Sequence, residues 1–267
     1  MLFRSIQSFD AGSNRANNMG TALEVFIKDA FANTLCERDD NVKSQAYNQV
    51  FSYLGNQNNP PDVILRNSDA IEVKKIESES SGLALNSSYP KDKLYNTDTR
   101  ITESCRTCES WIQKDILYAV GCINKNKLKY LWFVYGDCYA AEKNTYQRIA
   151  DTISNGLHNI SDIELAQTNE LGGVKKVDPL GITNLRIRGM WHIENPAKVF
   201  SYISTPAMQG FRLCCLMQTN KYLSLPMNDR NHLEQLSGIT IKDVRIKNPN
   251  NPAQLMDCKF VEYCHEQ

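Results

Sequence analysis

Hydrophobic and polar residues alternate along the chain in patterns that predict both helices and strands. Residues 18–35 place apolar side chains, Leu23 and Ile27 among them, at intervals of three and four, which is typical of an amphipathic helix. The segments DVILRN and AIEVKKIES are β-prone and flank the turn-forming Asn67-Ser68-Asp69. We therefore predict a helix that is followed by a β-hairpin.

The middle of the chain predicts a buried sheet. Residues 80–100 are rich in Ser, Asn and Asp and lack periodicity, so we expect an extended surface loop. Residues 115–123 and 128–135 are apolar, β-prone runs separated by a polar turn, as expected for central strands. Residues 142–157 show helical spacing of apolar side chains and predict a helix that packs on that sheet.

The last third of the chain is less regular. Residues 181–193 and 211–217 are predicted strands, whereas the Asn- and Pro-rich residues 247–254 predict a turn or loop. We find no internal repeat. We interpret the chain as a single domain with a core at about residues 15–160 and additional elements at about 161–267.

Composition narrows the range of partners. The chain has 267 residues, and its 30 Lys and Arg balance its 30 Asp and Glu, so a nucleic acid would have to meet a local basic cleft. Because no apolar run approaches the roughly 20 residues that span a bilayer, and the N-terminus lacks the apolar core of a signal peptide, we expect a cytoplasmic protein. Nine scattered cysteines then predict reduced thiols and no disulfide framework.

Two carboxylates and a lysine fall on the predicted hairpin. Pro61-Asp62 is followed, after nine residues, by Glu72-Val73-Lys74. Because side chains alternate along a strand, Glu72 and Lys74 point to one side and Val73 points to the core. Asp62, on the partner strand, reaches the same place. The pattern therefore predicts a small polar site at one end of a rigid sheet.

Phosphodiester hydrolysis needs these groups, because negative charge gathers on the phosphoryl oxygens and a water must lose a proton. Asp62, Glu72 and the Val73 carbonyl offer hard oxygen ligands for Mg²⁺, and Lys74 would orient the nucleophile and offset charge. Glu24, on the preceding helix, could add a ligand, although a helical Glu is more often a surface residue. A strand with alternating charges is also common as a solvated sheet face, so the motif alone does not decide the function.

A family resemblance adds to this interpretation. Asp62…Glu72-x-Lys74 resembles the catalytic motif of the PD-(D/E)xK nuclease superfamily, and it assigns catalysis to these three residues. The segments NPPDVILRNSDAIEVKKIES, ALNSSYPKDKL, CRTCESWIQKDILYAVG and LWFVYG resemble type II restriction endonucleases of the NgoPII family over about residues 14–140. The resemblance implies an α/β, restriction-endonuclease-like fold with a central mixed β-sheet flanked by α-helices.

The same resemblance implies a substrate and partners. We expect a homodimer that uses magnesium to cut both strands of a short palindromic site in double-stranded DNA, with GGCC as the natural candidate. The products would carry 5′-phosphate ends, and a cognate DNA methyltransferase would act beside the enzyme. Relatives in such families read different sites, so the target sequence stays open. The elements at about residues 161–267 would add DNA recognition.

Polar and basic side chains that follow the hairpin are candidate DNA contacts, although an ordinary solvated loop has the same composition. In the loop these are Asn86, Ser87, Ser88, Tyr89, Lys91 and Lys93. Gln113 and Lys114 open the next strand and would approach the scissile phosphate or the metal site, with a surface role equally open. Later residues with side chains suited to base edges are Arg186, Arg188, Trp191, His192, Arg212, Gln218, Asn220 and Lys221.

Two other functions remain open. One is a nuclease of the same superfamily that reads branched or damaged DNA, which would not give discrete fragments from a plasmid. The other is a non-catalytic DNA-binding module that holds zinc, which would bind DNA without cutting it. Cys105-x-x-Cys108 is only half of a zinc site, however, and Cys258, Cys264 and His265 lie far away in the sequence.

Overall fold

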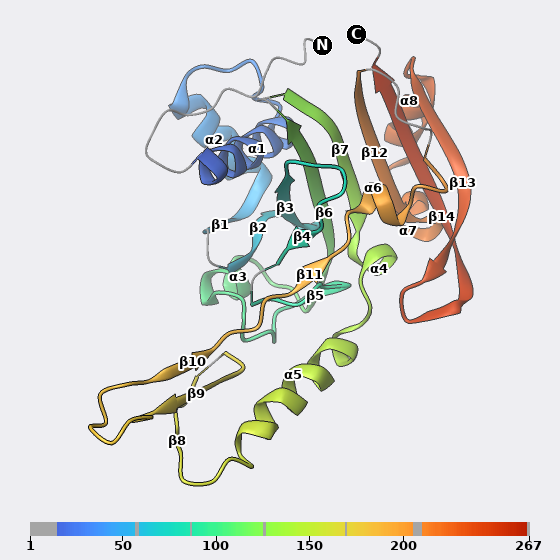
Figure 1. The fold of residues 1–267 in the computed structure, drawn as a ribbon. Coiled ribbons are helices and arrows are strands. Elements are labelled where there is room, and N and C mark those ends of the chain that lie inside the picture. The colour runs from blue at the N-terminus through green and yellow to red at the C-terminus, as the bar shows by residue number, and fades with distance from the viewer. Residues whose placement is uncertain are drawn as a thin grey trace.

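A mixed β-sheet forms the centre of the body of the molecule (Figure 1). The computed structural model describes residues 15–56, 59–85, 87–124, 127–168, 170–204 and 210–265. The strand order is β1-β2-β3-β6-β7-β12-β14-β13, with β5 paired to β6. The strands are β1 (Phe51–Asn56), β2 (Asn59–Leu65), β3 (Ala70–Ile76), β5 (Lys93–Tyr95), β6 (Gln113–Asn124), β7 (Lys127–Tyr135), β12 (Phe211–Gln218), β13 (Ile239–Asn248) and β14 (Asn251–His265). The predicted α/β fold with a mixed central sheet flanked by helices is confirmed.

The predicted hairpin and central strands form the middle of this sheet. β2 and β3 are antiparallel, and Val63 pairs with Ile71. β3 then runs parallel to β6, whose antiparallel partner is β7. β6 and β7 are almost continuously apolar because both faces are covered, and side chains such as Trp132 are fully buried.

One face of the sheet is covered by α1 (Arg15–Ala32), which confirms the predicted amphipathic helix. Its Leu23 and Ile27 are buried. The helix comes close because β6 has Gly121 there, where a Cβ atom would lie 2.7 Å from Leu23 Cδ2. The adjacent α2 (Asp40–Val50) was not predicted, because its sequence lacks an apolar stripe. In agreement with this, the helix has no buried residue.

The stretch at residues 80–100 is not the surface loop that we predicted. It contains β4 (Leu83–Ala84) and β5, and it buries Leu83, Leu85 and Leu94. β4 pairs with the distant β11 (His192–Ile193), so this segment belongs to a second layer over the sheet. The short helices α3 (Glu103–Thr107), α4 (Gly136–Tyr139) and α6 (Pro196–Val199) also contact strands of the sheet. The prediction failed because isolated apolar residues in an irregular segment show no period.

An arm extends from the body and is formed by residues 142–191 (Figure 1). It consists of the helix α5 (Lys143–Leu157) and a small sheet of β8 (Glu164–Leu165), β9 (Gly172–Lys175) and β10 (Leu185–Ile187). The predicted helix is confirmed, but its expected packing on the central sheet is wrong. Ala150 is its one fully buried residue, whereas Ile149 and Ile153 are 41% and 46% exposed.

The C-terminal part contributes β12, β13 and β14 together with α7 (Thr219–Ser224) and α8 (Met227–Gln235). The strand predicted at residues 211–217 is confirmed as β12. The expected turn at 247–254 is confirmed between Asn248 and Asn251, but the residues that follow belong to β14. The hairpin of β13 and β14 was missed. Among the described helices, none combines the length and apolarity needed to cross a membrane.

Candidate active site

The site lies where β2 and β3 separate. Their described ladder joins Val63 to Ile71 and Ile64 to Ala70, and Asp62 and Glu72 come directly after the last pair. There the Val73 N–H donates to Asp62 Oδ2 at 2.6 Å. The aspartate carboxylate thus occupies the position that a backbone acceptor would take if the strands stayed paired, and this bond fixes its orientation.

Glu72 and Lys74 meet on one side of β3, as strand alternation predicts. The Lys74 Nζ atom lies 2.5 Å from Glu72 Oε1. The other oxygen, Glu72 Oε2, is buried and has no hydrogen-bond partner among the residues that the structure describes. A buried carboxylate oxygen without a partner is costly and uncommon, so this atom marks a place where a cation or a donor would be favourable.

The electrostatics of the three groups are coupled. Burial, together with the negative charge of Glu72, raises the pKa of Asp62 to about 8. Burial also disfavours the charge on Lys74, but the carboxylates of Glu72 and Asp62 outweigh it and raise the pKa of Lys74. Lys74 is therefore a permanent cation, while the carboxylates of Asp62 and Glu72 repel each other at short range.

This arrangement fits a divalent ion. Two neighbouring carboxylates, one with a free oxygen, are the hard ligands that Mg²⁺ prefers, and Mg²⁺ usually keeps several waters. Among the residues that the structure describes, no set of three or more His, Cys, Asp and Glu side chains is placed to hold a metal. Asp62 and Glu72 would therefore be the side-chain ligands, with the Val73 carbonyl as the predicted backbone ligand.

Glu24 is near this centre but engaged elsewhere. It lies on α1, and its carboxylate is 2.5 Å from the Lys28 ammonium. Its negative charge contributes to the raised pKa values of both Asp62 and Lys74. The structure therefore places Glu24 within the electrostatic field of the site, but not in a three-carboxylate ligand set.

The basic residues predicted to contact DNA after the hairpin are largely occupied inside the protein. Lys91 is only 4% exposed and pairs with Asp98, while its backbone N–H donates to the Tyr118 hydroxyl at 2.7 Å. Lys93 is half-buried between Asp115 and Asp137, at 2.5 and 2.8 Å. Both lysines therefore form ion pairs within the folded protein and are not presented to DNA.

The other loop candidates differ in exposure. Ser87 is exposed, whereas the buried hydroxyl of Ser88 has no partner among the described residues. Tyr89 is buried and its ring stacks on that of Tyr146 at the base of the arm. Trp191, where the arm returns, packs edge-on against both rings. The remaining candidate, Asn86, lies outside the described residues.

The candidates farther along the chain lie in different parts of the molecule. Gln113 is exposed at the start of β6, while Lys114 is buried, pairs with Glu109 and donates to the Ser68 carbonyl. On the arm, Arg186 and Arg188 are well exposed, but both contact the carboxylate of Glu170.

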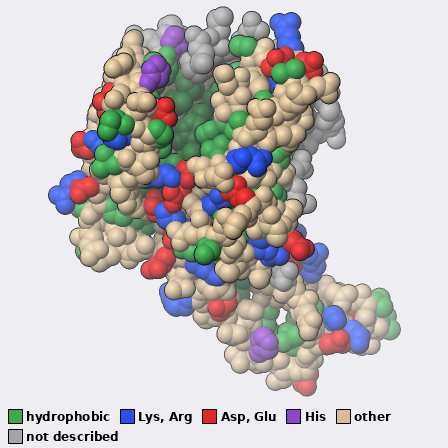
Figure 2. All heavy atoms as spheres, turned by 180° about the vertical axis from the view of Figure 1, so that it is seen from behind, with side chains coloured by type: hydrophobic (Ala, Val, Ile, Leu, Met, Phe, Trp, Pro, Cys, Tyr) green, Lys and Arg blue, Asp and Glu red, His purple; other side chains and the backbone are tan. Residues whose placement is uncertain are grey.

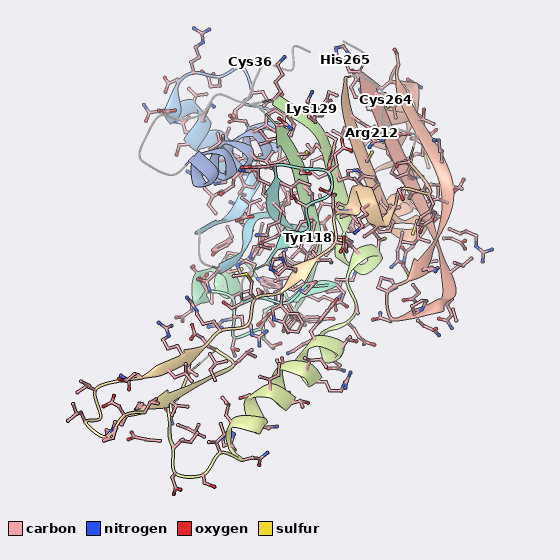
Figure 3. All side chains as sticks on the ribbon, in the orientation of Figure 1. Cys36, Tyr118, Lys129, Arg212, Cys264 and His265 are labelled. Carbon is pink, nitrogen blue, oxygen red and sulfur yellow. The ribbon has the colours of Figure 1, made fainter. Side chains whose placement is uncertain are left out.

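Predicted base readers are also spread over several elements. His192 is exposed on β11, and Asn220 is exposed on α7. Gln218 ends β12, and Arg212 lies at the opposite end of that strand (Figure 3). Figure 2 shows Lys and Arg side chains interspersed with Asp and Glu across the face drawn there. Within the described residues, that face carries no continuous basic patch.

The cysteines are divided between separate regions. Cys105 is buried in α3, and burial raises the pKa of its thiol to about 12. Cys258 lies on β14 beside Cys138, with 3.9 Å between the sulfur atoms, while Cys264 and His265 lie at the end of that strand (Figure 3). The structure therefore does not join Cys105 and Cys108 with the later candidates for zinc.

Two features near the site escaped the sequence analysis. Tyr118 is the register partner of Glu72 on β6 and holds the backbone of Lys91. Asp69 and Asp115 both form ion pairs with Lys221, for which the sequence predicts only a role as a base reader. Neither feature has a local sequence signal, because the partners are brought together from distant segments.

A mixed sheet whose diverging hairpin carries two acidic groups and a lysine defines a restriction-endonuclease-like nuclease. The sequence profile of the NgoPII restriction endonuclease family matches residues 3–247. The chain is also 46% identical over 260 residues to the type II restriction enzyme NgoPII of Neisseria gonorrhoeae, covering 97% of this chain and 93% of that protein. The chain therefore belongs to the NgoPII restriction endonuclease family, and its class is that of a type II restriction endonuclease. No solved structure matches it.

Proposed function

We propose that this restriction endonuclease uses Mg²⁺, held by Asp62 and Glu72, to hydrolyse one phosphodiester bond in each strand of a short palindromic DNA site. The observation that carries the proposal is the buried Glu72 Oε2 beside Asp62 and Lys74, which has no partner within the described part of the chain. Two acids and a permanent cation at one sheet edge suit a reaction in which negative charge builds up on phosphoryl oxygens.

Each side chain has a distinct task in this mechanism. The Val73 N–H holds the Asp62 carboxylate in place, so the acidic pair is oriented before the substrate arrives. The Lys74 ammonium, which pairs with Glu72, would bind a phosphoryl oxygen and orient the attacking water. A bound Mg²⁺ ion would supply positive charge beside the scissile phosphate and make water more acidic.

The substrate and partners follow from the family. We propose GGCC as the target, products with 5′-phosphate ends, a homodimer and a cognate methyltransferase that protects the host DNA. The exposed Ser87 and Gln113 are proposed phosphate contacts. Arg186 and Arg188 are proposed contacts from the arm, if DNA displaces Glu170 from them. A cytoplasmic location remains a prediction from the sequence.

Plasmid cleavage tests the proposal directly. Unmethylated plasmid incubated with Mg²⁺ should give discrete fragments, and their ends should map to one short palindrome with 5′-phosphates. A smear, or cutting confined to branched DNA, would instead indicate a nuclease that reads DNA structure. Absence of cutting with any divalent metal would reject hydrolysis at this site.

Lys74→Ala tests the residue assignment. Cleavage should fall by at least about 10²-fold, because the ammonium that would offset charge on the phosphoryl oxygens is removed, while DNA binding should persist. Lys75→Ala is the matched control, since the adjacent Lys75 pairs with the exposed Glu77. Normal cutting by Lys74→Ala would contradict the catalytic assignment.

A further inference from the structure

A lysine from the C-terminal part of the chain holds the turn that begins the catalytic strand. Lys221, on α7, places its ammonium 2.7 Å from Asp69 Oδ1 and 2.6 Å from Asp115 Oδ2. Asp69 directly precedes β3, and Asp115 lies near the start of β6, the neighbouring strand. The hydroxyl of Tyr135, from the end of β7, donates to Asp69 Oδ2 at 2.7 Å.

The hairpin depends on such external contacts because its own ladder is short. Two described residue pairs join β2 to β3, and the catalytic Asp62 and Glu72 lie immediately beyond them. A shift of one residue in this register would turn the side chains of β3 to the opposite face. The turn is further held by Lys114, which donates to the Ser68 carbonyl at 2.7 Å.

Lys221 is also part of a longer chain of alternating charges. Asp115 accepts from both Lys221 and Lys93, and Lys93 continues to Asp137. The side chain of Lys221 is only 20% exposed, and its ammonium lies 5.0 Å from the centre of the Tyr135 ring. An ammonium with two carboxylates and an aromatic ring around it is engaged in the fold and is not presented to a DNA base.

We propose that Lys221 is a positioning residue for cleavage: it fixes the Asp69 turn, and through it the register of the strand that carries Glu72 and Lys74. Lys221 adjoins the exposed Asn220 on α7, so the same contact ties a segment available to DNA to the catalytic hairpin. The inference rests on the proposed function of that hairpin.

Lys221→Met tests it, because methionine keeps most of the apolar stem and removes the charge. The single-turnover cleavage rate should fall about tenfold or more, since small displacements of reacting groups are costly. The Mg²⁺ concentration for half-maximal rate should rise, because the spacing of Asp62 and Glu72 is no longer fixed. DNA affinity measured without metal should stay unchanged, and Lys221→Arg should restore much of the rate.

Lys198→Met is the matched control, because Lys198 pairs with Glu194 on the exposed surface and should leave every readout unchanged. A folded Lys221→Met enzyme with normal rate and Mg²⁺ dependence would overturn the proposal. Lost DNA affinity with a normal rate at saturating DNA would also overturn it and make Lys221 a DNA contact.

A second variant covers the case in which Lys221→Met does not fold. Asp69→Asn keeps the shape of the turn and weakens the same contact, and it should reproduce the change in rate and Mg²⁺ dependence. A folded Asp69→Asn enzyme that behaves like the wild type would overturn the proposal. The two hypotheses fail differently: if the wild-type protein does not cut DNA at all, the proposed function is wrong, whereas the positioning role fails only in the variants.

Discussion

At the scale of single residues, the ionisation of Asp62 links the site to stability. Its pKa is raised to about 8 by burial and by the charge of Glu72. Between its ordinary value near 3.8 and about 8, the folded protein therefore holds a proton that the unfolded chain has released. Stability falls as pH rises through this window, because the unfolded state binds fewer protons than the folded one.

This predicts how the metal-free protein melts. The melting temperature should fall between pH 5 and pH 8, and Asp62→Asn should remove much of that fall, since an amide does not ionise. Each kcal/mol corresponds to roughly 2–4 °C for a protein of this size. Thermal unfolding of both proteins in the presence of a chelator measures the difference. An unchanged pH profile in the variant would show that Asp62 does not titrate in this range.

Lys91 gives a second prediction, because the sequence suggested a DNA contact and the structure shows a buried ion pair. Asp98→Ala would leave the Lys91 charge buried and unpaired, at a cost of about 3–5 kcal/mol. Lys91→Met should be less destabilising, because the Asp98 carboxylate that it leaves behind is more exposed than Lys91, 11% against 4%, and still accepts from the Arg100 backbone N–H at 2.9 Å. Urea unfolding measures both effects.

DNA affinity discriminates between the two roles of Lys91. If the ion pair is structural, Lys91→Met should bind DNA like the wild type and show the same salt dependence, which reports on the number of phosphate contacts. A clear decrease in the salt dependence would favour the original assignment. The sequence could not reveal the pairing, since Asp98 follows seven residues later in a segment without periodicity.

At the scale of secondary structure, strand alternation was enough to predict how Asp62, Glu72 and Lys74 meet. The spacing of side chains in a strand is fixed by the backbone, so the prediction needed only the hairpin. The β4 segment could not be predicted in the same way, because it is short and its partner β11 is more than 100 residues away. The strands β13 and β14 were missed because their exposed positions mix charged and apolar residues.

The helix α5 illustrates the limit of periodicity. An apolar stripe predicts a helix, but it does not say which surface covers that stripe. We expect Ile153→Ser, on the exposed stripe, to change the free energy of unfolding by no more than about 0.5 kcal/mol. Leu23→Ala, in the buried face of α1, should cost about 2–5 kcal/mol.

Chemical unfolding of Ile153→Ser and Leu23→Ala under the same conditions measures the change in the free energy of unfolding at each site. The difference in burial dominates the comparison, since both positions are apolar residues in helices and Ile153 is 46% exposed whereas Leu23 is fully buried. A cost for Ile153→Ser as large as that for Leu23→Ala would mean that α5 packs on the body of the protein, as the sequence first suggested.

At the scale of the whole molecule, the balanced charge and the exposed apolar side chains of the arm both bear on how the protein contacts other macromolecules. Acidic and basic side chains cancel over the chain, and many lysines near the site are paired internally. The arm meanwhile exposes Leu180, Ile182 and Met190. Monomeric proteins seldom leave extended apolar patches in water, so exposed apolar groups on a projecting element suit contact with another macromolecule.

The two-fold symmetry of the proposed DNA site predicts how many protein chains bind one duplex. Each chain has one Asp62-Glu72-Lys74 site, so cutting both strands of a palindrome at equivalent positions calls for two copies related by a two-fold axis. We expect Lys74→Ala, which should bind without cutting, to form a complex of two 30.4 kDa chains on one duplex that contains the target. The mass of the complex in solution measures this directly, with a scrambled duplex as the control. One chain per target duplex, at saturating protein, would mean that the two strands are cut in separate encounters and that the palindrome does not reflect the symmetry of the enzyme.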